Sequence, residues 1–172
     1  VLRKLGAPSS LMPSRSRIPR EGIKLLGAPN FRKTDLNIYG TAQPNLAGLY
    51  TILTLLGAGP RNPEHISCTW FNTREEPLIF INDEPFVLRD QAHPSENIKA
   101  YAGISRERLE MMEERLKMDA LGEAIDSGGL ILVHDEKDTG EVMPCLVAIE
   151  TVKTSLEVIS SGSHASISYT CM

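Results

Sequence analysis

One spacing in this sequence matches the arrangement that a nucleophilic thiol requires, because Cys68 is followed six residues later by Arg74. In such a C-x5-R loop, backbone N–H groups surround a phosphate, the thiolate attacks phosphorus, and the arginine binds the oxyanions. The loop needs small residues, chiefly glycine, so that successive amides can converge. Here the bulky Trp70 and Phe71 stand in it. We therefore predict that Cys68 is a packed strand residue, as buried cysteines commonly are, and we predict no catalytic residue.

Metal and redox chemistry have little support in this sequence. It contains neither C-x-x-C nor H-E-x-x-H, and its four histidines are scattered, so we expect no metal site and no cofactor. The acidic run before Gly140 lacks the alternating carboxylates and the final glutamate of a calcium loop. Three cysteines are an odd number without paired spacing, which favours reduced thiols and a cytoplasmic location.

The net charge of −4 is unevenly distributed. Residues 1–33 carry eight Lys or Arg against Glu21 alone, a net charge of +7, and the remaining residues carry ten against 21 Asp or Glu, a net charge of −11. A basic segment could bind nucleic acid through counterion release. This one lacks interleaved aromatic residues and a recognisable reading motif, so we expect no nucleic-acid partner.

Helical and strand patterns alternate along the chain, which predicts an α/β architecture. Apolar residues recur at helical spacing over 43–56, with Pro44 in the first turn, and over 105–126, where Ser105 is the expected N-cap and Glu113 is expected on a charged face. Short apolar runs predict strands, with a hairpin around residues 82–85. The predicted strands are 65–72, 78–82, 86–89, 130–134 and 142–151. No apolar run approaches the ~20 residues of a membrane span.

The composition of the two ends differs from that of the middle. Prolines among serines and arginines predict an irregular basic arm over 1–21. The end of the chain, 159–172, is rich in serine and is predicted to be a loose tail. The sequence does not begin with methionine, and we therefore expect it to be a fragment. The domain organisation is therefore an arm, a domain over 22–158, and a tail.

Several compound motifs resemble a known family. They are the segments 27–32, 38–44, 70–77, 106–108, 111–117 and 134–136. Together they resemble the paladin-type repeat of the protein-tyrosine-phosphatase-like inositol polyphosphate phosphatases, over roughly residues 22–158. This resemblance implies part of the α/β cysteine-phosphatase fold, a mixed sheet flanked by helices. It also implies metal-free phosphate release from inositol polyphosphates or related phosphoesters, through a phosphocysteine and an aspartic general acid.

In that family the glycine-rich C-x5-R loop and the acid-bearing loop follow the region matched here. Cys145 has no arginine six residues later, so the resemblance predicts the front part of a phosphatase that is inactive alone. The alternatives are a non-catalytic phosphate-binding or regulatory module, or a truncated chain with no stable fold. The expected partners are an inositol phosphate or a phosphoprotein, and further repeats of a larger parent protein.

Three cations are candidate substrate-binding residues. The resemblance places Phe31-Arg32 beside the phosphate-rich substrate, and the guanidinium of Arg32 suits phosphate, with Lys33 as a second cation. The alternative is an exposed charged turn. Arg74, with Glu75 and Glu76, could support the site, or it could belong to a structural ion-pair network at a strand end.

Overall fold

The computed structural model describes residues 1–5, 24–34, 36–59, 66–93, 96–136, 141–161 and 167–171. Their helices are α1 (Leu46–Leu55), α2 (Arg106–Asp126) and α3 (Ser155–Ser161), with a 3-10 turn, η1, at Lys99–Tyr101. Their strands are β1 (Leu2–Lys4), β2 (Arg32–Lys33), β3 (Tyr39–Gly40), β4 (Cys68–Asn72), β5 (Leu78–Ile81), β6 (Glu84–Leu88), β7 (Leu130–Glu136), β8 (Val142–Ala148), β9 (Val152–Thr154) and β10 (Ile167–Cys171).

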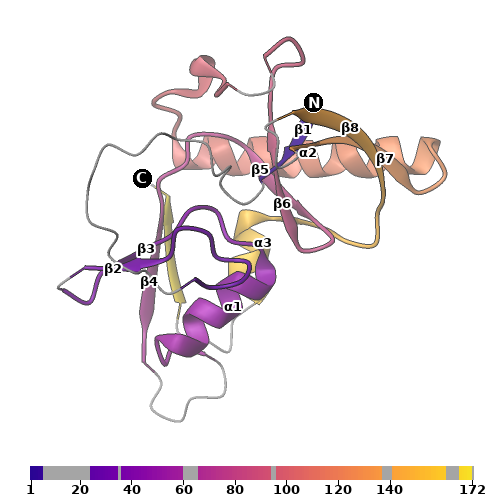
Figure 1. Cartoon of the computed structure of the whole chain (residues 1–172). Coiled ribbons are helices and arrows are strands. Elements are labelled where there is room, and N and C mark those ends of the chain that lie inside the picture. The colour runs from indigo at the N-terminus through magenta and orange to yellow at the C-terminus, as the bar shows by residue number, and fades with distance from the viewer. Residues whose placement is uncertain are drawn as a thin grey trace.

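A six-stranded mixed sheet lies at the centre, in the order β8-β7-β1-β6-β5-β9 (Figure 1). Its pairs are antiparallel except β1–β7. The short β1 is held between two longer strands, with Leu2 opposite Leu88 on one side and Val133 on the other. Two smaller sheets pair β10 with β4 in parallel and β2 with β3 antiparallel.

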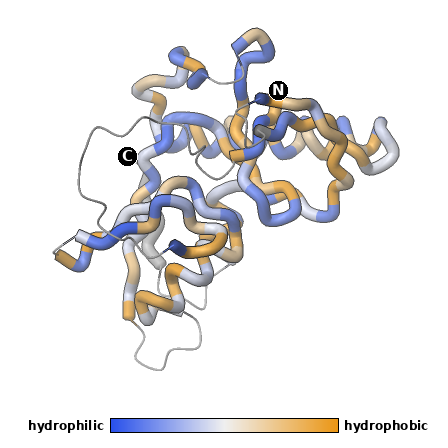
Figure 2. Tube along the Cα trace, in the orientation of Figure 1, coloured by the Kyte–Doolittle hydropathy of each residue, from blue (hydrophilic) through white to orange (hydrophobic). Residues whose placement is uncertain are grey.

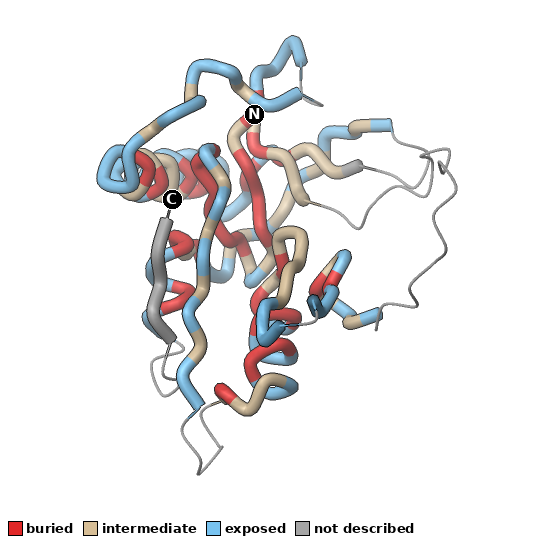
Figure 3. Tube along the Cα trace, turned by 90° about the vertical axis from the view of Figure 1, so that its left-hand side faces the viewer, coloured by how far each residue is buried: buried red, intermediate tan, exposed pale blue. Residues whose placement is uncertain are grey.

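The two faces of the sheet are covered by different helices because the side chains of a strand alternate between faces. Ile79 and Ile81 of β5 pack with Ala120 of α2, whereas Leu78 and Phe80 pack against α1 and α3. All four residues of β5 are buried, and buried residues gather in the central strands (Figure 3). Hydrophobic residues also run through α1 (Figure 2). The mixed α/β fold with flanking helices is confirmed.

The half of the sheet formed by β7 and β8 carries exposed apolar side chains on the side away from α2. Leu132 and Leu146 face each other across the two strands and are 48% and 65% exposed. Their neighbours Ile131 and Val133 point the other way and are buried beneath α2. β7 begins with the four apolar residues 130–133, and only the two that face α2 are buried.

The predicted elements are present with shifted ends. Asn45 caps α1 by accepting a hydrogen bond from the N–H of Gly48 at 2.9 Å, so Pro44 precedes the helix and does not lie in its first turn. Ser105 caps α2 as predicted. The β5–β6 hairpin turns at Asn82 and Asp83, which both have positive φ. The predicted strand 142–151 is divided into β8 and β9.

Both ends of the chain differ from their predictions. The first residues of the expected irregular arm form β1, because β6 and β7 satisfy their backbone hydrogen bonds; residues 6–23 lie outside the described part. The expected loose tail begins inside α3 and continues into β10, which pairs with β4. The domain boundaries at 21/22 and 158/159 stay predictions.

Glu113 lies inside the structure, contrary to its predicted position on a charged face. The residue is 2% exposed. Its Oε1 accepts hydrogen bonds from the N–H of Leu78 at 3.1 Å and the hydroxyl of Ser155 at 3.0 Å, and its Oε2 accepts one from the N–H of Ser155 at 3.1 Å. One carboxyl group thus joins α2 to β5 and to the first turn of α3.

Burial raises the pKa of Glu113 to about 7, although the hydrogen bonds from Leu78 and Ser155 oppose that shift and only Glu110 adds to it. The folded protein therefore binds this proton more tightly than the unfolded chain does. Its stabilising contribution is complete below about pH 4.5 and is lost as the pH rises through about 7.

We predict that the wild-type chain loses stability relative to Glu113→Gln between pH 4.5 and pH 8. The difference should reach roughly 3 kcal/mol, since one pKa unit corresponds to about 1.4 kcal/mol. Urea unfolding of both chains across this range measures it, and the variant controls for every other titrating group. Parallel pH profiles would contradict the prediction.

Candidate anion-binding site

The C-x5-R spacing does not form a phosphate cradle. Cys68 is the first residue of β4 and Arg74 lies two residues beyond its end. Because a strand rises about 3.3 Å per residue, the two Cα atoms are separated by roughly 20 Å of extended chain. Burial raises the pKa of the Cys68 thiol, and the side chain packs against the α1–α3 core. The arrangement lacks both the converging amides and the thiolate.

We predict that Cys68 reacts slowly with iodoacetamide at pH 7, because its thiol is half-buried and protonated. Mass spectrometry of the modified peptides gives the rate for Cys68, and the same chain in denaturant supplies the unprotected reference rate. Faster modification in the folded chain than in denaturant would show an activated thiol.

Arg74 belongs to an ion-pair cluster at the end of β4. Oε2 of Glu76 lies 2.7 Å from Nη1 of Arg89 and 3.5 Å from Nη1 of Arg74. Glu76 and Arg89 are each 6% exposed. Desolvation lowers the pKa of Arg74 and the charge of Glu76 opposes that effect. Glu75 points elsewhere and accepts a hydrogen bond from the N–H of Gly103 at 2.9 Å. These contacts fit a structural network; a substrate contact through Arg74 stays a prediction.

We predict that Arg89→Met destabilises the fold by about 3–5 kcal/mol, because it leaves the Glu76 carboxylate buried without its nearer partner. The double variant Glu76→Leu/Arg89→Met should recover most of that loss, since it removes both buried charges. Arg74→Met, the matched control at the more exposed arginine, should lose much less. Urea denaturation measures all three, and equal losses for the two single variants would contradict the assignment.

Arg32 and Lys33 form β2 of a small hairpin, where Arg32 lies opposite Gly40 and Lys33 opposite Tyr39. The rings of Phe31 and Tyr39 stack with centroids 6.0 Å apart. Phe31 is buried with Ala28 and Ile52, so the hairpin is anchored on α1. Both cations are exposed. The structure therefore presents both cations at the surface of a hairpin that packs against α1.

The base of this hairpin is fixed by a close approach of two glycines. A Cβ on Gly48 of α1 would lie 2.0 Å from the carbonyl oxygen of Gly27, and that carbonyl accepts a hydrogen bond from the N–H of Asn45 at 3.0 Å. Gly27 has φ +77, which L-residues with a side chain rarely adopt. The loop before β2 therefore rests directly on the start of α1.

The two cations of the hairpin have different surroundings. Nη1 of Arg32 donates to the backbone oxygen of Asn30 at 3.1 Å, whereas Nζ of Lys33 lies 5.7 Å from the centroid of the Tyr39 ring. Among the described residues, neither has an acidic partner, and no hydrogen bond or ion pair joins either to Arg74. The described residues of the hairpin thus offer no acidic partner to either cation, and Arg74 forms a separate cluster.

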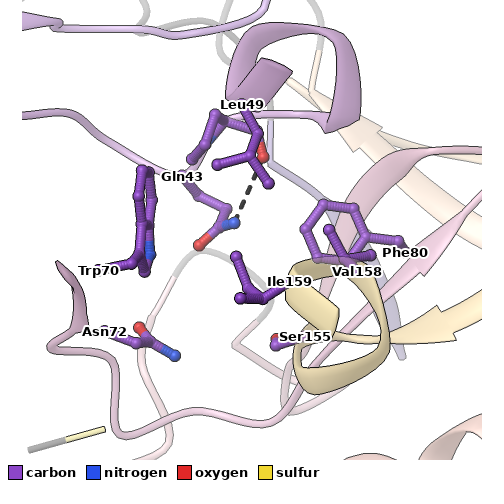
Figure 4. Close-up of a pocket in the computed structure, with 9 residues that line it drawn as sticks. Gln43, Leu49, Trp70, Asn72, Phe80, Ser155, Val158 and Ile159 are labelled. Carbon is purple, nitrogen blue, oxygen red and sulfur yellow. Dashed lines mark hydrogen bonds between the residues drawn. The ribbon is translucent and has the colours of Figure 1, made fainter. Parts of the chain in front are cut away.

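A small pocket lies between α1, β4 and α3, close to the hairpin support (Figure 4). Trp70, Leu49, Phe80 and Ile159 line it, and Gln43 reaches in from the segment before α1. The cavity measures about 20 Å³, which is room for one water molecule. A phosphate ester cannot enter it, so this pocket is not an anion-binding site. Trp70 also contacts the cluster beneath the hairpin.

Two absences hold for the part of the chain that the structure describes. No three His, Cys, Asp or Glu residues there are grouped so as to hold a metal ion. No helix in the same residues is both long and apolar enough to pass through a bilayer.

Residues 71–170 match the family model PTP-like phytase, whose description is inositol hexakisphosphate. That match spans more than half of the 172 residues. The chain belongs to this family. Within it, the chain is a paladin-type repeat: it is 37% identical to human Paladin over 92 residues, which are 49% of this chain and 10% of that protein. The chain spans about a tenth of the length of the curated relatives that it matches.

Solved structures of PTP-like phytases share the fold. The phytase from Bdellovibrio bacteriovorus aligns with a TM-score of 0.51 and 23% identity, covering 83% of this chain and 43% of that one. The PTP-like myo-inositol phosphatase from Mitsuokella multacida was solved in complex with myo-inositol-(1,3,4,5)-tetrakisphosphate. It aligns with a TM-score of 0.51 and 15% identity, covering 74% of this chain and 19% of that one. The prediction of a PTP-like fold is confirmed.

Two features of the candidate site were missed from the sequence. The motif at residues 38–44 did not predict that Gly40 lies against Arg32. It also did not predict that the ring of Tyr39 lies beneath Lys33. Both contacts follow from the β2–β3 register. A Phe-Arg-Lys followed by Tyr-Gly at hairpin distance is the signal that could have suggested this pairing.

Proposed function

We propose that this chain is the front part of a cysteine-dependent phosphatase for inositol polyphosphates or related phosphoesters, and that it binds such anions without hydrolysing them alone. The observation that carries the proposal is the exposed guanidinium of Arg32, which has no acidic partner among the described residues. An exposed arginine whose described neighbours include no carboxylate, on a hairpin packed against α1, suits the planar, bidentate recognition of phosphate.

The conformation around Cys68 supports the proposed inactivity of the isolated chain. Cys68–Arg74 is the C-x5-R of these 172 residues, and β4 holds it extended. Family membership supports inositol polyphosphates as ligands, as does the tetrakisphosphate bound to the Mitsuokella multacida enzyme. The nucleophile would then come from outside these residues, in a longer parent protein with further repeats. The odd number of cysteines supports a cytoplasmic location.

In this proposal Arg32 contacts the anion directly and Lys33 adds positive potential from the same hairpin. Arg74 contributes through the ion-pair cluster that holds the end of β4. The alternative is a non-catalytic phosphate-binding or regulatory module with the same cations. The ion pair of the half-buried Arg74 with Glu76 and the strand conformation of Cys68 also allow this alternative. The two proposals predict different behaviour of a longer parent protein. Phosphate release by that protein would support the phosphatase, and binding of the anion without phosphate release would support the non-catalytic module.

We predict that the purified chain binds inositol hexakisphosphate and that Arg32→Ala weakens binding about tenfold or more, because a charge-assisted hydrogen bond is lost. Arg115→Ala, which removes an equally long, exposed cation from α2, should leave the affinity unchanged. Isothermal titration calorimetry measures both. Phosphate release should be absent in the wild type and in Cys68→Ser.

Two outcomes would contradict this proposal. Equal affinities of Arg32→Ala and Arg115→Ala would show that the hairpin does not bind the ligand. Phosphate release that disappears in Cys68→Ser would show that the chain is an enzyme by itself, with a nucleophile that the extended β4 does not account for.

A further inference from the structure

We propose that Gly40 positions Arg32 for phosphate, and that Arg32 alone, without Lys33, makes the direct contact with the anion. This inference rests on the proposed function and specifies how its site is built. Gly40 lies in β3 directly opposite Arg32. It touches no ligand in this scheme, so it is a positioning residue, and it acts through the arginine side chain that lies on it.

The guanidinium of Arg32 lies flat over the α-carbon of Gly40. A Cβ built on Gly40 would lie 2.9 Å from Cζ, 3.0 Å from Nη2 and 3.2 Å from Nε of Arg32. Because these three distances are nearly equal, the plane of the guanidinium, and not its edge, faces the glycine. A methyl group at residue 40 would therefore press on the guanidinium, which is the flexible end of its side chain and would have to move away from its present position.

The backbone at Gly40 does not itself require glycine. Gly40 is not among the described glycines with positive φ, so alanine fits its conformation without strain. The atoms nearest to an added Cβ all belong to the Arg32 side chain. The absence of a side chain at residue 40 therefore serves the arginine and not the turn of the chain.

A second contact fixes the rotation of the guanidinium. Nη1 of Arg32 donates to the carbonyl oxygen of Asn30 at 3.1 Å. Asn30 has φ +56, in the left-handed region, which turns the chain just before β2. Among the described residues, the other N–H groups of Arg32 have no hydrogen-bond partner. They stay available for a phosphoryl group, and a guanidinium already held in place loses little entropy on binding.

Lys33 cannot share this contact, because neighbouring residues of a strand point to opposite faces. Its ammonium lies over the ring of Tyr39, 5.7 Å from the centroid, and Tyr39 is in turn stacked on Phe31. The hairpin therefore presents one cation on each face. This differs from the sequence-based expectation that Lys33 adds a second cation to the same phosphate.

The test compares the affinity for inositol hexakisphosphate of four single variants of the full 172-residue chain, measured by calorimetry. Gly40→Ala should weaken binding about tenfold, close to Arg32→Ala, and Lys33→Ala threefold at most. Gly122→Ala is the matched control: it lies within α2, lacks a positive φ, and has no atom within 4 Å of an added Cβ. Its affinity should equal that of the wild type.

A double-variant cycle separates positioning from general damage. If Gly40 acts only through Arg32, then Gly40→Ala has no further effect on binding in the Arg32→Ala background. The same holds in the Arg32→Lys background, since lysine has no flat guanidinium to displace. Circular dichroism and the thermal midpoint of Gly40→Ala should match the wild type. If Gly40→Ala does not fold, the prediction that Arg32→Lys alone loses most of the affinity takes its place.

Each failure has its own signature. An Arg32→Ala chain with wild-type affinity overturns the proposed function and this inference together. A weakened Arg32→Ala beside a normal Gly40→Ala overturns only the positioning role. Additive losses in the double variant would show that Gly40 acts by another route. A Lys33→Ala loss as large as that of Arg32→Ala would overturn the claim of a single direct cation.

Discussion

The carboxyl group of Glu113 is the contact on which the two sides of the sheet depend. It lies on α2, yet it accepts hydrogen bonds from the backbone of β5 and from the first residue of α3. Without it, the N–H of Leu78 and the N–H and hydroxyl of Ser155 would lose these hydrogen bonds inside the protein, which is costly. Residues of α3 and β5 also line the small pocket beside β4. Glu113 therefore connects α2 to elements that lie next to the support of the candidate site.

The arginines of this chain differ in burial. The buried ones form ion pairs that stabilise the fold, and an exposed one can bind a ligand. Arg89 and Glu76 are withdrawn from water and need each other, because an isolated buried charge is strongly destabilising. Arg74 joins them at the edge of the cluster, with part of its charge already compensated. Arg32 is the opposite case: it is exposed, and its backbone contact with Asn30 directs the side chain without neutralising it.

Close contacts through glycine give the hairpin its geometry. Gly27 and Gly48 allow the loop before β2 to touch α1, and Gly40 leaves space for the guanidinium across the strand pair. Phe31 and Tyr39 supply the apolar support beneath. The position of the Arg32 guanidinium is thus set by contacts with the backbone at Asn30 and Gly40, and the described part of the chain places no carboxylate beside it.

Local patterns were enough for the elements that carry strong periodicity or capping. The helix over 105–126, its Ser105 cap, the β5–β6 hairpin and the strand character of Cys68 were all predictable, because each depends on neighbours within a few residues. The compound motifs also identified the family. Other features depend on residues that are far apart in the chain, and local patterns could not predict them. The strand β1 exists because β6 and β7 flank it, and Glu113 is buried because β5 and α3 present N–H groups to it. The contact of Arg32 with Gly40 is local by comparison, but it depends on the register of the β2–β3 pair.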